Sequence, residues 1–400
     1  MSLQNFFKFL KKTSVEEIGR EPSALSEGLC RQFSLAELKA ATNNFDDHMK
    51  IGEGGFGPVY KGLIDGGSLV VAIKRFIRSS LQGVQEFQNE GELLCQMRHQ
   101  NLVSLLGFCH EKDERILVYE YMIHGSLGGH LFGNADPLPW KRRLEICIGA
   151  ARGLHYLHTG TKYTIIYRDA KPSNILLDEN WDAKLSDFGL SKIGPLNISK
   201  PKPNALTKTE SRIRGTMGYM APEYARHGEL TVKIDVYALG IVLLEVLCGR
   251  KNFDRIAEEE NMISGILKCI KNGRVHDMID PFLNGKIAPV CLTEFVEIAL
   301  SCIHPNPNER PSMGEVEVTL ELALELQEKA DLVIKAVNPH AGYTYDDVSF
   351  RVSFADLKKC HNPFADLEEY SNSFNRYSVE LVESISVAGS MSDTELEIGR

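Results

Sequence analysis

The chain has 400 residues, of which 43% are hydrophobic, so it can form one large two-lobed enzyme with extensions or a few separate domains. Its formal net charge of −9 argues against nucleic acid as the main partner, because phosphate binding needs a basic surface. The 9 cysteines are scattered and no two have CxxC spacing, which argues against a disulfide framework or a zinc site. We expect reduced thiols at core positions.

The first 45 residues predict an extension that carries one short helix. The opening stretch, MSLQNFFKFLKK, lacks the apolar block of a signal peptide, and residues 1–32 are polar and weakly patterned. In FSLAELKAATNNF (33–45), Ser34 and Glu37 have capping-box spacing, so a helix should begin there. We expect a cytoplasmic location. The alternative for the phenylalanine-rich start is peripheral contact with the plasma membrane.

Strand patterns run from residue 48 to about 77. They include VYKGLIDGGSLVVAIKRF, in which two strand runs flank Asp65-Gly66-Gly67, a strong hairpin signal. Residues 84–99 have helical spacing, and LVSLLGF and RILVYEYM predict two more strands. The order predicts a small β-rich unit with one prominent helix.

Helical patterns dominate from residue 140 to about 329. The longest apolar run, 237–249, is too short for a membrane span and contains Glu245, so it predicts a buried helix. Residues 330–400 lack sustained periodicity, and we expect them to be disordered or to fold only on binding.

A glycine-rich run, IGEGGFGPV, places Gly52, Gly54 and Gly57 at G-x-G-x-x-G spacing. Dinucleotide-binding folds use such a run where it opens a helix. Here the run lies in a strand–turn–strand, and VVAIK places Lys74 on the next strand. This context favours a flap whose backbone N–H groups approach phosphate oxygens over an ordinary glycine-rich hairpin.

Lys74 needs an acidic partner to hold it toward phosphates. The helix predicted over 84–99 offers Glu86, Glu90 and Glu92, and its distance from the following strand favours Glu90. The neighbouring Gly91 is a poor helix former, at a cost of about 1 kcal/mol relative to Ala, which makes this helix easier to shift.

The stretch IIYRDAKPSN (165–174) has the residues of a phosphoryl-transfer loop. Asp169 would accept the proton of the attacking hydroxyl, and Lys171 would neutralise the γ-phosphate. Asn174 and Asp187, the latter in SDFGL, would hold Mg²⁺, with Mn²⁺ as a substitute. The kinase signature has His where this chain has Tyr167.

These motifs give the chain a resemblance to eukaryotic protein kinases over residues 46–329, flanked by 1–45 and 330–400. It resembles plant receptor-like kinases and their receptor-less cytoplasmic relatives of the Pelle type, closest to the intracellular part of malectin-domain receptor kinases. The phrases that carry this resemblance are FSLAELKAATNNF, IGEGGFGPVYKG, RHQNLVSLLGFC, ILVYEYM, GAARGLHYLH, SNILLDENWDAKLSDFGLSK and CIHPNPNERPSM. The family fold is α+β and bilobal, with a small β-rich N-lobe and a larger helical C-lobe.

The resemblance also implies an ATP site. Tyr119 would be the gatekeeper, the backbones of Glu120 and Met122 would bind adenine, and three apolar side chains would sandwich the ring. The full set implied is Ile51, Gly52, Glu53, Gly54, Gly55, Phe56, Gly57, Val59, Ala72, Lys74, Tyr119, Glu120, Met122 and Leu176. Position 167 would stack with Leu94, Leu105 and Phe188, Asp235 would anchor the catalytic loop, and Glu223 would pair with Arg310.

Regulation would lie in the segment between Asp187 and Glu223. Arg168 precedes the catalytic aspartate, and a phosphate added near 207–211 could pair with it and order the segment. The hydroxyl side chains proposed for this role are Thr207, Thr209, Ser211 and Thr216. The alternative is a solvated, flexible loop.

Two functions from different classes fit the chain. The first is an ATP-dependent serine/threonine kinase that phosphorylates proteins and itself in signalling, alone or with a membrane receptor or co-receptor. The second is a pseudokinase scaffold, which would usually lack one of the site residues. The departures from the family pattern, Tyr167, Ile234 and Gly91, remove no group that touches phosphate, metal or the transferred proton. The sequence therefore favours the enzyme.

Overall fold

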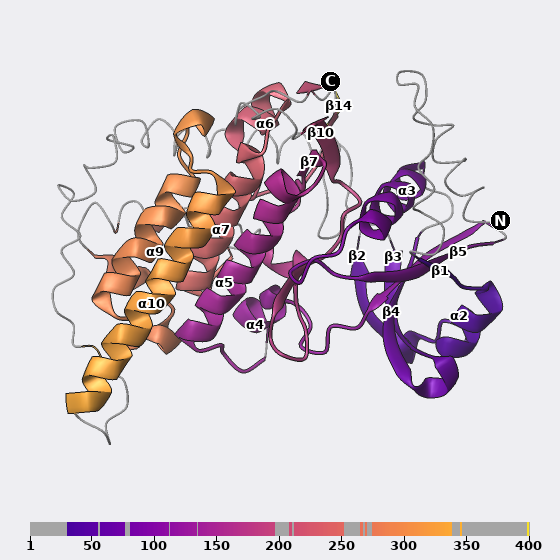
Figure 1. Ribbon diagram of the computed structural model, residues 1–400, viewed down its shortest axis with the longest axis horizontal. Helices are drawn as coiled ribbons and strands as arrows, with labels where there is room; N and C mark the ends of the chain where they lie inside the picture. The colour runs from indigo at the N-terminus through magenta and orange to yellow at the C-terminus, as the bar shows by residue number, and fades with distance from the viewer. Residues whose placement is uncertain are drawn as a thin grey trace.

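The computed structural model describes residues 30–54, 57–76, 81–111, 113–133, 135–196, 208–209, 212–251, 265–266, 269, 274–337, 345 and 398–399. A β-rich lobe comes first in the chain and lies beside a larger helical lobe (Figure 1). The predicted α+β, two-lobed architecture is present.

The N-lobe is built on a six-stranded sheet in the order β1-β5-β6-β4-β3-β2. Its strands are antiparallel neighbours except β1, which runs parallel to β5. The predicted hairpin is present, and Asp65, Gly66 and Gly67 turn it with positive φ angles of 52°, 69° and 89°. The strands are β1 (Arg31–Gln32), β2 (Lys50–Gly54), β3 (Gly57–Ile64), β4 (Leu69–Arg75), β5 (Leu105–Glu111) and β6 (Glu114–Glu120).

The helix α2 (Leu35–Ala41) begins at the predicted capping box, in which Ser34 and Glu37 cap each other. Its buried face, with Phe33 in front of it, packs on Val71 and Ile73 of the sheet. The described part of the predicted extension, residues 30–45, is thus packed into the N-lobe, because its apolar side chains cover one face of the sheet. Weak structure was predicted for residues 1–32, of which 30–32 are described, and Arg31–Gln32 form β1. Residues 1–29 lie outside the described part.

The second N-lobe helix, α3 (Leu81–Gln96), contacts β5 and β6 and lies toward the helical lobe (Figure 1). The C-lobe helices are α4 (Leu127–Phe132), α5 (Trp140–His155), α6 (Pro222–His227), α7 (Lys233–Cys248), α9 (Pro289–Cys302) and α10 (Met313–Val337). Its short strands are β7 (Tyr163–Ile166), β8 (Ile175–Leu177), β9 (Ala183–Leu185), β10 (Lys192–Leu196), β11 (Lys208–Thr209), β12 (Arg212–Ile213), β13 (Glu229–Leu230) and β14 (Ile398–Gly399).

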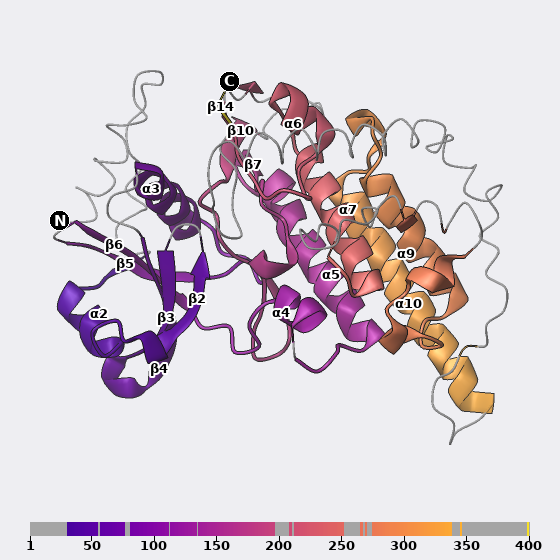
Figure 2. The ribbon, with the colours of Figure 1, turned by 180° about the vertical axis from the view of Figure 1, so that it is seen from behind.

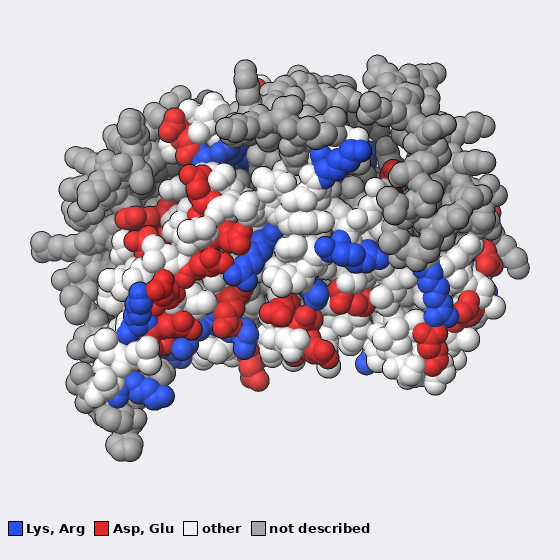
Figure 3. All heavy atoms as spheres, in the orientation of Figure 1, with Lys and Arg blue, Asp and Glu red and all other residues white. Residues whose placement is uncertain are grey.

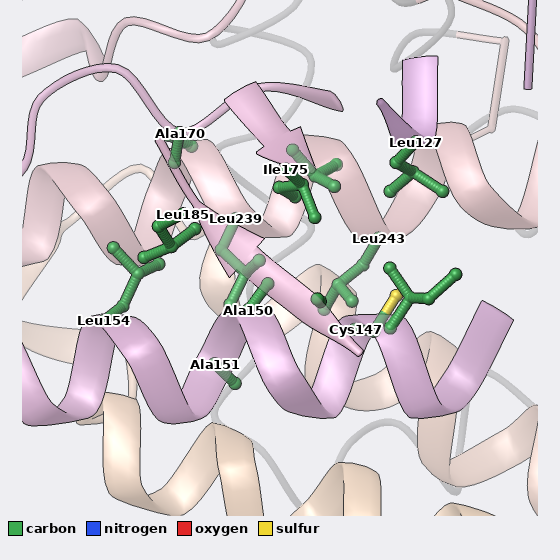
Figure 4. Packing of buried hydrophobic residues seen from close by; sticks show 14 of the residues in the cluster. Leu127, Cys147, Ala150, Ala151, Leu154, Ala170, Ile175, Leu185, Leu239 and Leu243 are labelled. Carbon is green, nitrogen blue, oxygen red and sulfur yellow. The ribbon is translucent and has the colours of Figure 1, made fainter. Parts of the chain in front are cut away.

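Residues 237–248 of the apolar run lie in α7, and every residue of that helix is buried, as predicted. Helices α5 and α9 contact it, and α10 packs on both of them (Figure 2). Figure 4 shows Ala170 and Ile175, from the segment that follows β7, above Leu154 of α5 and Leu239 of α7. The helical core therefore supports that segment from below.

The end of the domain differs from the expected boundary at residue 329. Helix α10 continues without a break to Val337, so residues 330–337 are helical. Beyond it, the Tyr345 hydroxyl donates to Asp331 Oδ1 at 2.6 Å and its backbone N–H donates to the Gly285 carbonyl at 2.8 Å. Strand β14 pairs with β12. The rest of the predicted tail is outside the described residues.

Two surface properties concern possible partners. Acidic and basic side chains are interspersed on the face shown in Figure 3. Arg152 of α5 pairs with Glu317 and Glu321 of α10. Within the described ranges, no helix combines the length and apolar character that a bilayer span requires.

Candidate active site

The segment after β7 is held from inside the C-lobe by a carboxylate at the start of α7. Asp235 is fully buried and accepts hydrogen bonds from the backbone N–H groups of Tyr167 and Arg168, at 2.9 and 2.7 Å. His158 Nε2 lies 2.8 Å from the same carboxylate. Because Arg168 has a φ of +75°, these bonds also hold a backbone conformation that L-residues rarely adopt. The residues that follow are thus fixed in position.

Three side chains converge on the Asp169 carboxylate. The Thr216 hydroxyl donates to Oδ1 at 2.6 Å, and Asn174 Nδ2 donates to Oδ2 at 2.7 Å. Lys171 Nζ lies 2.9 Å from Oδ2 and donates to the Thr216 hydroxyl at 2.8 Å. Thr216, which the sequence suggested only as a phosphorylation site, therefore joins the aspartate and the lysine.

Lys74 of β4 and Glu90 of α3 form the predicted ion pair, at 2.9 Å, and Lys74 also contacts Asp187 Oδ1 at 2.7 Å. The lysine and the glutamate are both buried. Burial disfavours the charged lysine, but the carboxylates of Asp187 and Glu90 outweigh it and raise the pKa of Lys74 above its usual value. Lys74 is therefore a fixed cation between the two lobes.

The glycine-rich hairpin lies next to this lysine in the sheet, since Val59 of β3 is opposite Lys74 of β4. A Cβ added at Gly52 or Gly54 would meet nothing within 4 Å, so neighbouring side chains leave that side of the hairpin open. The tip residues Gly55 and Phe56 fall outside the described part of the chain. The described hairpin fits the predicted flap.

The residues predicted around adenine come from three elements. Ala72 of β4 is opposite the buried Tyr119 of β6, and Leu176 of β8 forms a bridge with Ser126. The Glu120 carboxylate accepts the Ser104 N–H at 2.7 Å, which fixes the strand end. Met122 is buried, whereas Ile51 and Glu53 are exposed.

Comparison with known proteins identifies this arrangement, because the protein kinase domain family matches residues 45–319. The chain belongs to the protein kinase family. It is 52% identical over 316 residues to Receptor-like protein kinase FERONIA of Arabidopsis thaliana. The matched region covers 78% of the chain and 34% of FERONIA. It is also 52% identical over 316 residues to Receptor-like protein kinase ANXUR2 of Arabidopsis thaliana, a match that covers 78% of the chain and 36% of ANXUR2. Over 300 residues it is 49% identical to Receptor-like protein kinase HERK 1 of Arabidopsis thaliana, and this match covers 74% of the chain and 35% of HERK 1.

The chain thus spans about a third of the length of these relatives. The predicted resemblance to plant receptor-like kinases and the predicted kinase fold are both confirmed. The chain carries a protein kinase domain, and such domains are transferases that use ATP and a divalent metal. The pseudokinase alternative is not favoured.

The unusual Tyr167 of this kinase is an internal packing residue. Its ring is fully buried 5.2 Å from that of Phe188, at 57°, and Leu94 and Leu105 belong to the same buried cluster. The Tyr167 hydroxyl donates to the carbonyl of Ser186, the residue before Asp187. Burial raises the pKa of Tyr167 well above its usual value, so the hydroxyl keeps its proton and remains a donor.

Arg168 of the kinase points away from Asp169. Its guanidinium donates to the Leu190 carbonyl at 3.1 Å and to the Tyr224 hydroxyl, and its Nε is buried without an acceptor among the described residues. Of the proposed phosphorylation sites, Thr209 lies in β11, which pairs with β13. Thr207 and Ser211 are not among the described residues.

One positioning residue of the kinase was missed by the sequence reasoning. Asn89 of α3 places Nδ2 between 2.8 and 3.0 Å from the carbonyl oxygens of Phe188, Gly189 and Ser191. It ties the helix that carries Glu90 to the segment that carries Asp187. The sequence contained no signal for it, because an asparagine on a predicted helix is ordinarily a solvated residue.

Proposed function

We propose that the domain is an active kinase that transfers the γ-phosphoryl group of ATP to serine and threonine hydroxyls, with Asp169 as the proton acceptor. The observation that carries the proposal is that the side chains expected to bind phosphate and metal, and those expected to handle the proton, each form a connected set with no member missing. Lys74, Glu90 and Asp187 form one, and Asp169, Lys171 and Asn174 form the other. A scaffold without activity has no need of both.

Asn174 and Asp187 fit a magnesium ion by their donor chemistry. Asn174 directs its amide nitrogen to Asp169, which leaves the amide oxygen for a cation, and Asp187 uses only Oδ1 to bind Lys74. Among the described residues no three acidic, His or Cys side chains gather around one point. This agrees with Mg²⁺, which takes one or two protein ligands and completes its shell with phosphates and water, and Mn²⁺ would be held likewise. The ion would neutralise charge on the phosphates.

Separate residues of the chain would position the substrate hydroxyl, accept its proton and bind the phosphates. Asp169 already accepts a hydrogen bond from a threonine hydroxyl, and an incoming hydroxyl would be held in the same way while its proton passes to the carboxylate. Lys171 would offset charge on the transferred group, and Lys74, fixed by Glu90, would hold the remaining phosphates. The adenine-site residues implied by the family complete the proposal.

We also propose that phosphorylation at 207–211 orders the segment through Arg168. Its support is the buried Arg168 Nε, which has no acceptor within the described residues and would gain one in a nearby phosphate. Thr216 is a poorer candidate than the sequence suggested, because its hydroxyl is already bonded to Asp169 and Lys171.

The setting of the kinase belongs to the same proposal. A cytoplasmic location is supported by the cysteines of the described ranges, which are free thiols, the state that a reducing compartment maintains. A membrane receptor or co-receptor as partner is supported only by the relatives, which are named receptor-like kinases.

The test is transfer of labelled γ-phosphate by the full chain to peptides whose single acceptor is Ser, Thr or Tyr, with Mg²⁺ or Mn²⁺. We expect transfer to Ser and Thr that requires the metal, and none by Asp187→Asn. Equal transfer by wild type and Asp187→Asn would support the scaffold, and transfer to Tyr alone would overturn the proposed specificity.

A further inference from the structure

The hydroxyl of Tyr224 in α6 joins the segment after β7 to the chain segment that carries Thr216. It accepts hydrogen bonds from Arg168 Nη2 and from the Arg214 backbone N–H, the second at 3.1 Å, and it donates to the Arg214 carbonyl at 3.1 Å. Tyr224 is buried. A phenol has one proton to donate and also accepts through its oxygen, so these three bonds use its hydrogen-bonding capacity in full.

The two segments that this hydroxyl joins meet again at the reacting centre. Arg168 immediately precedes Asp169 in the sequence. Arg214 lies two residues before Thr216, whose hydroxyl donates to Asp169 Oδ1 at 2.6 Å. Between these points Gly215 has a φ of +150°, and a Cβ added there would lie 3.5 Å from the Arg168 carbonyl oxygen. The contacts therefore form a closed ring around the proposed proton acceptor.

Each segment is fixed to the C-lobe at a further point. On one side, Asp235 accepts the Arg168 backbone N–H at 2.7 Å. On the other, the Tyr219 hydroxyl lies 3.0 and 2.9 Å from the two carboxylate oxygens of Glu245, which is fully buried in α7. Thr216 lies between this second contact and the bonds to the α6 hydroxyl, so its place is determined from both ends of the segment.

We propose that Tyr224 is a positioning residue for the protein acceptor, which it aligns by holding Thr216 against the carboxylate of Asp169. The inference rests on the proposed phosphoryl transfer, in which the acceptor hydroxyl enters beside that carboxylate. Without the tyrosine hydroxyl, the backbone of Arg214 would lose its link to Arg168, and the segment would move relative to the proton acceptor. The acceptor would then be held in a less productive position.

The side of the site that is proposed to hold phosphate and metal is fixed by a separate set of contacts. Lys74 contacts Asp187 at 2.7 Å and Glu90 at 2.9 Å, so these three side chains fix one another. Binding of ATP should therefore survive the loss of the tyrosine hydroxyl, whereas use of the acceptor should not.

A role for Tyr224 in packing alone makes a different prediction. Helix α6 is also held by the neighbouring Glu223, whose carboxylate binds Arg310 at 2.6 and 2.8 Å. The Tyr224 ring is buried, and its centroid lies 5.4 Å from the Arg168 guanidinium. Both features remain when only the hydroxyl is removed, so packing alone predicts no selective effect on the acceptor.

The test compares the full wild-type chain with Tyr224→Phe, which removes the hydroxyl and keeps the ring. We expect kcat/KM for a Ser/Thr peptide to fall at least about tenfold, while KM for ATP changes less than about twofold. Amide exchange of residues 214–216, measured without ATP, should speed up at least about threefold, because the Arg214 N–H loses its acceptor. Tyr237→Phe, at another buried tyrosine of the C-lobe, is the control and should match wild type in all three measurements.

Three results would each overturn the proposal. They are unchanged exchange of residues 214–216 in Tyr224→Phe, losses of equal size for peptide and ATP, and the same loss for the peptide in Tyr237→Phe. Absence of transfer by wild type would refute the proposed function and the acceptor role with it. The exchange measurement separates the two failures, because it reports the anchoring of the segment without any kinase activity.

Discussion

Replacement of Tyr167 by phenylalanine tests whether this position packs or takes part in the chemistry. The change removes only the hydroxyl that donates to the Ser186 carbonyl and keeps the ring that contacts Phe188. Because the group is fully buried, no water replaces the lost bond. A lost buried hydrogen bond that leaves its acceptor unpaired costs about 1–3 kcal/mol. We expect a fall in the free energy of unfolding of that size.

The effect on catalysis should be smaller. The hydroxyl bonds to the backbone beside Asp187, so its loss loosens a metal ligand but removes no reacting group. We expect kcat to fall less than about tenfold, and Tyr167→His, which keeps a polar ring, to change basal activity modestly.

The assay is urea unfolding together with steady-state kinetics on the same preparations. Tyr163→Phe serves as the control, because that tyrosine is exposed and surface substitutions usually change stability by less than about 0.5 kcal/mol. Two results would refute the reasoning: unchanged stability of Tyr167→Phe, or abolished kcat in a variant that remains folded.

Further predictions concern three other contacts. Glu90→Gln should lower kcat/KM for ATP about 100-fold by releasing Lys74, whereas Glu92→Gln on the same helix should leave it unchanged; equal losses would exclude a special role for Glu90. Thr216→Val should reduce kcat at least about tenfold and Thr216→Ser should retain it, so a fully active valine variant would contradict the bridging role. Arg310→Ala should lower the free energy of unfolding by about 3–5 kcal/mol, because its buried bidentate pair with Glu223 is broken; a urea midpoint like that of wild type would count against this.

The sequence predicted the site residues that belong to ordered motifs. Lys74 and Glu90 could be paired in advance because a strand and a helix of known period fix where their side chains lie. The hairpin at Asp65-Gly66-Gly67 and the capping box at Ser34 were predictable for the same local reason.

What the sequence missed depends on contacts between distant segments. Thr216 reaches Asp169 across 47 positions and Asn89 reaches Phe188 across 99, and neither residue type signals such a partner. The helix within 33–45 was predicted but its packing onto the sheet was not, because a local pattern does not name the surface that its apolar face covers; Phe33 and Leu38 are buried in one cluster with Val71 and Ile73.

The most direct test of the central claim compares wild type with Asp169→Asn. The substitution keeps the size of the side chain but removes the carboxylate that is proposed to accept the proton. The account predicts that wild type transfers phosphate from Mg-ATP to itself and to a Ser/Thr peptide, and that the variant binds ATP and unfolds as wild type does but shows no transfer. Equal transfer by the two proteins, or none by either, would contradict it.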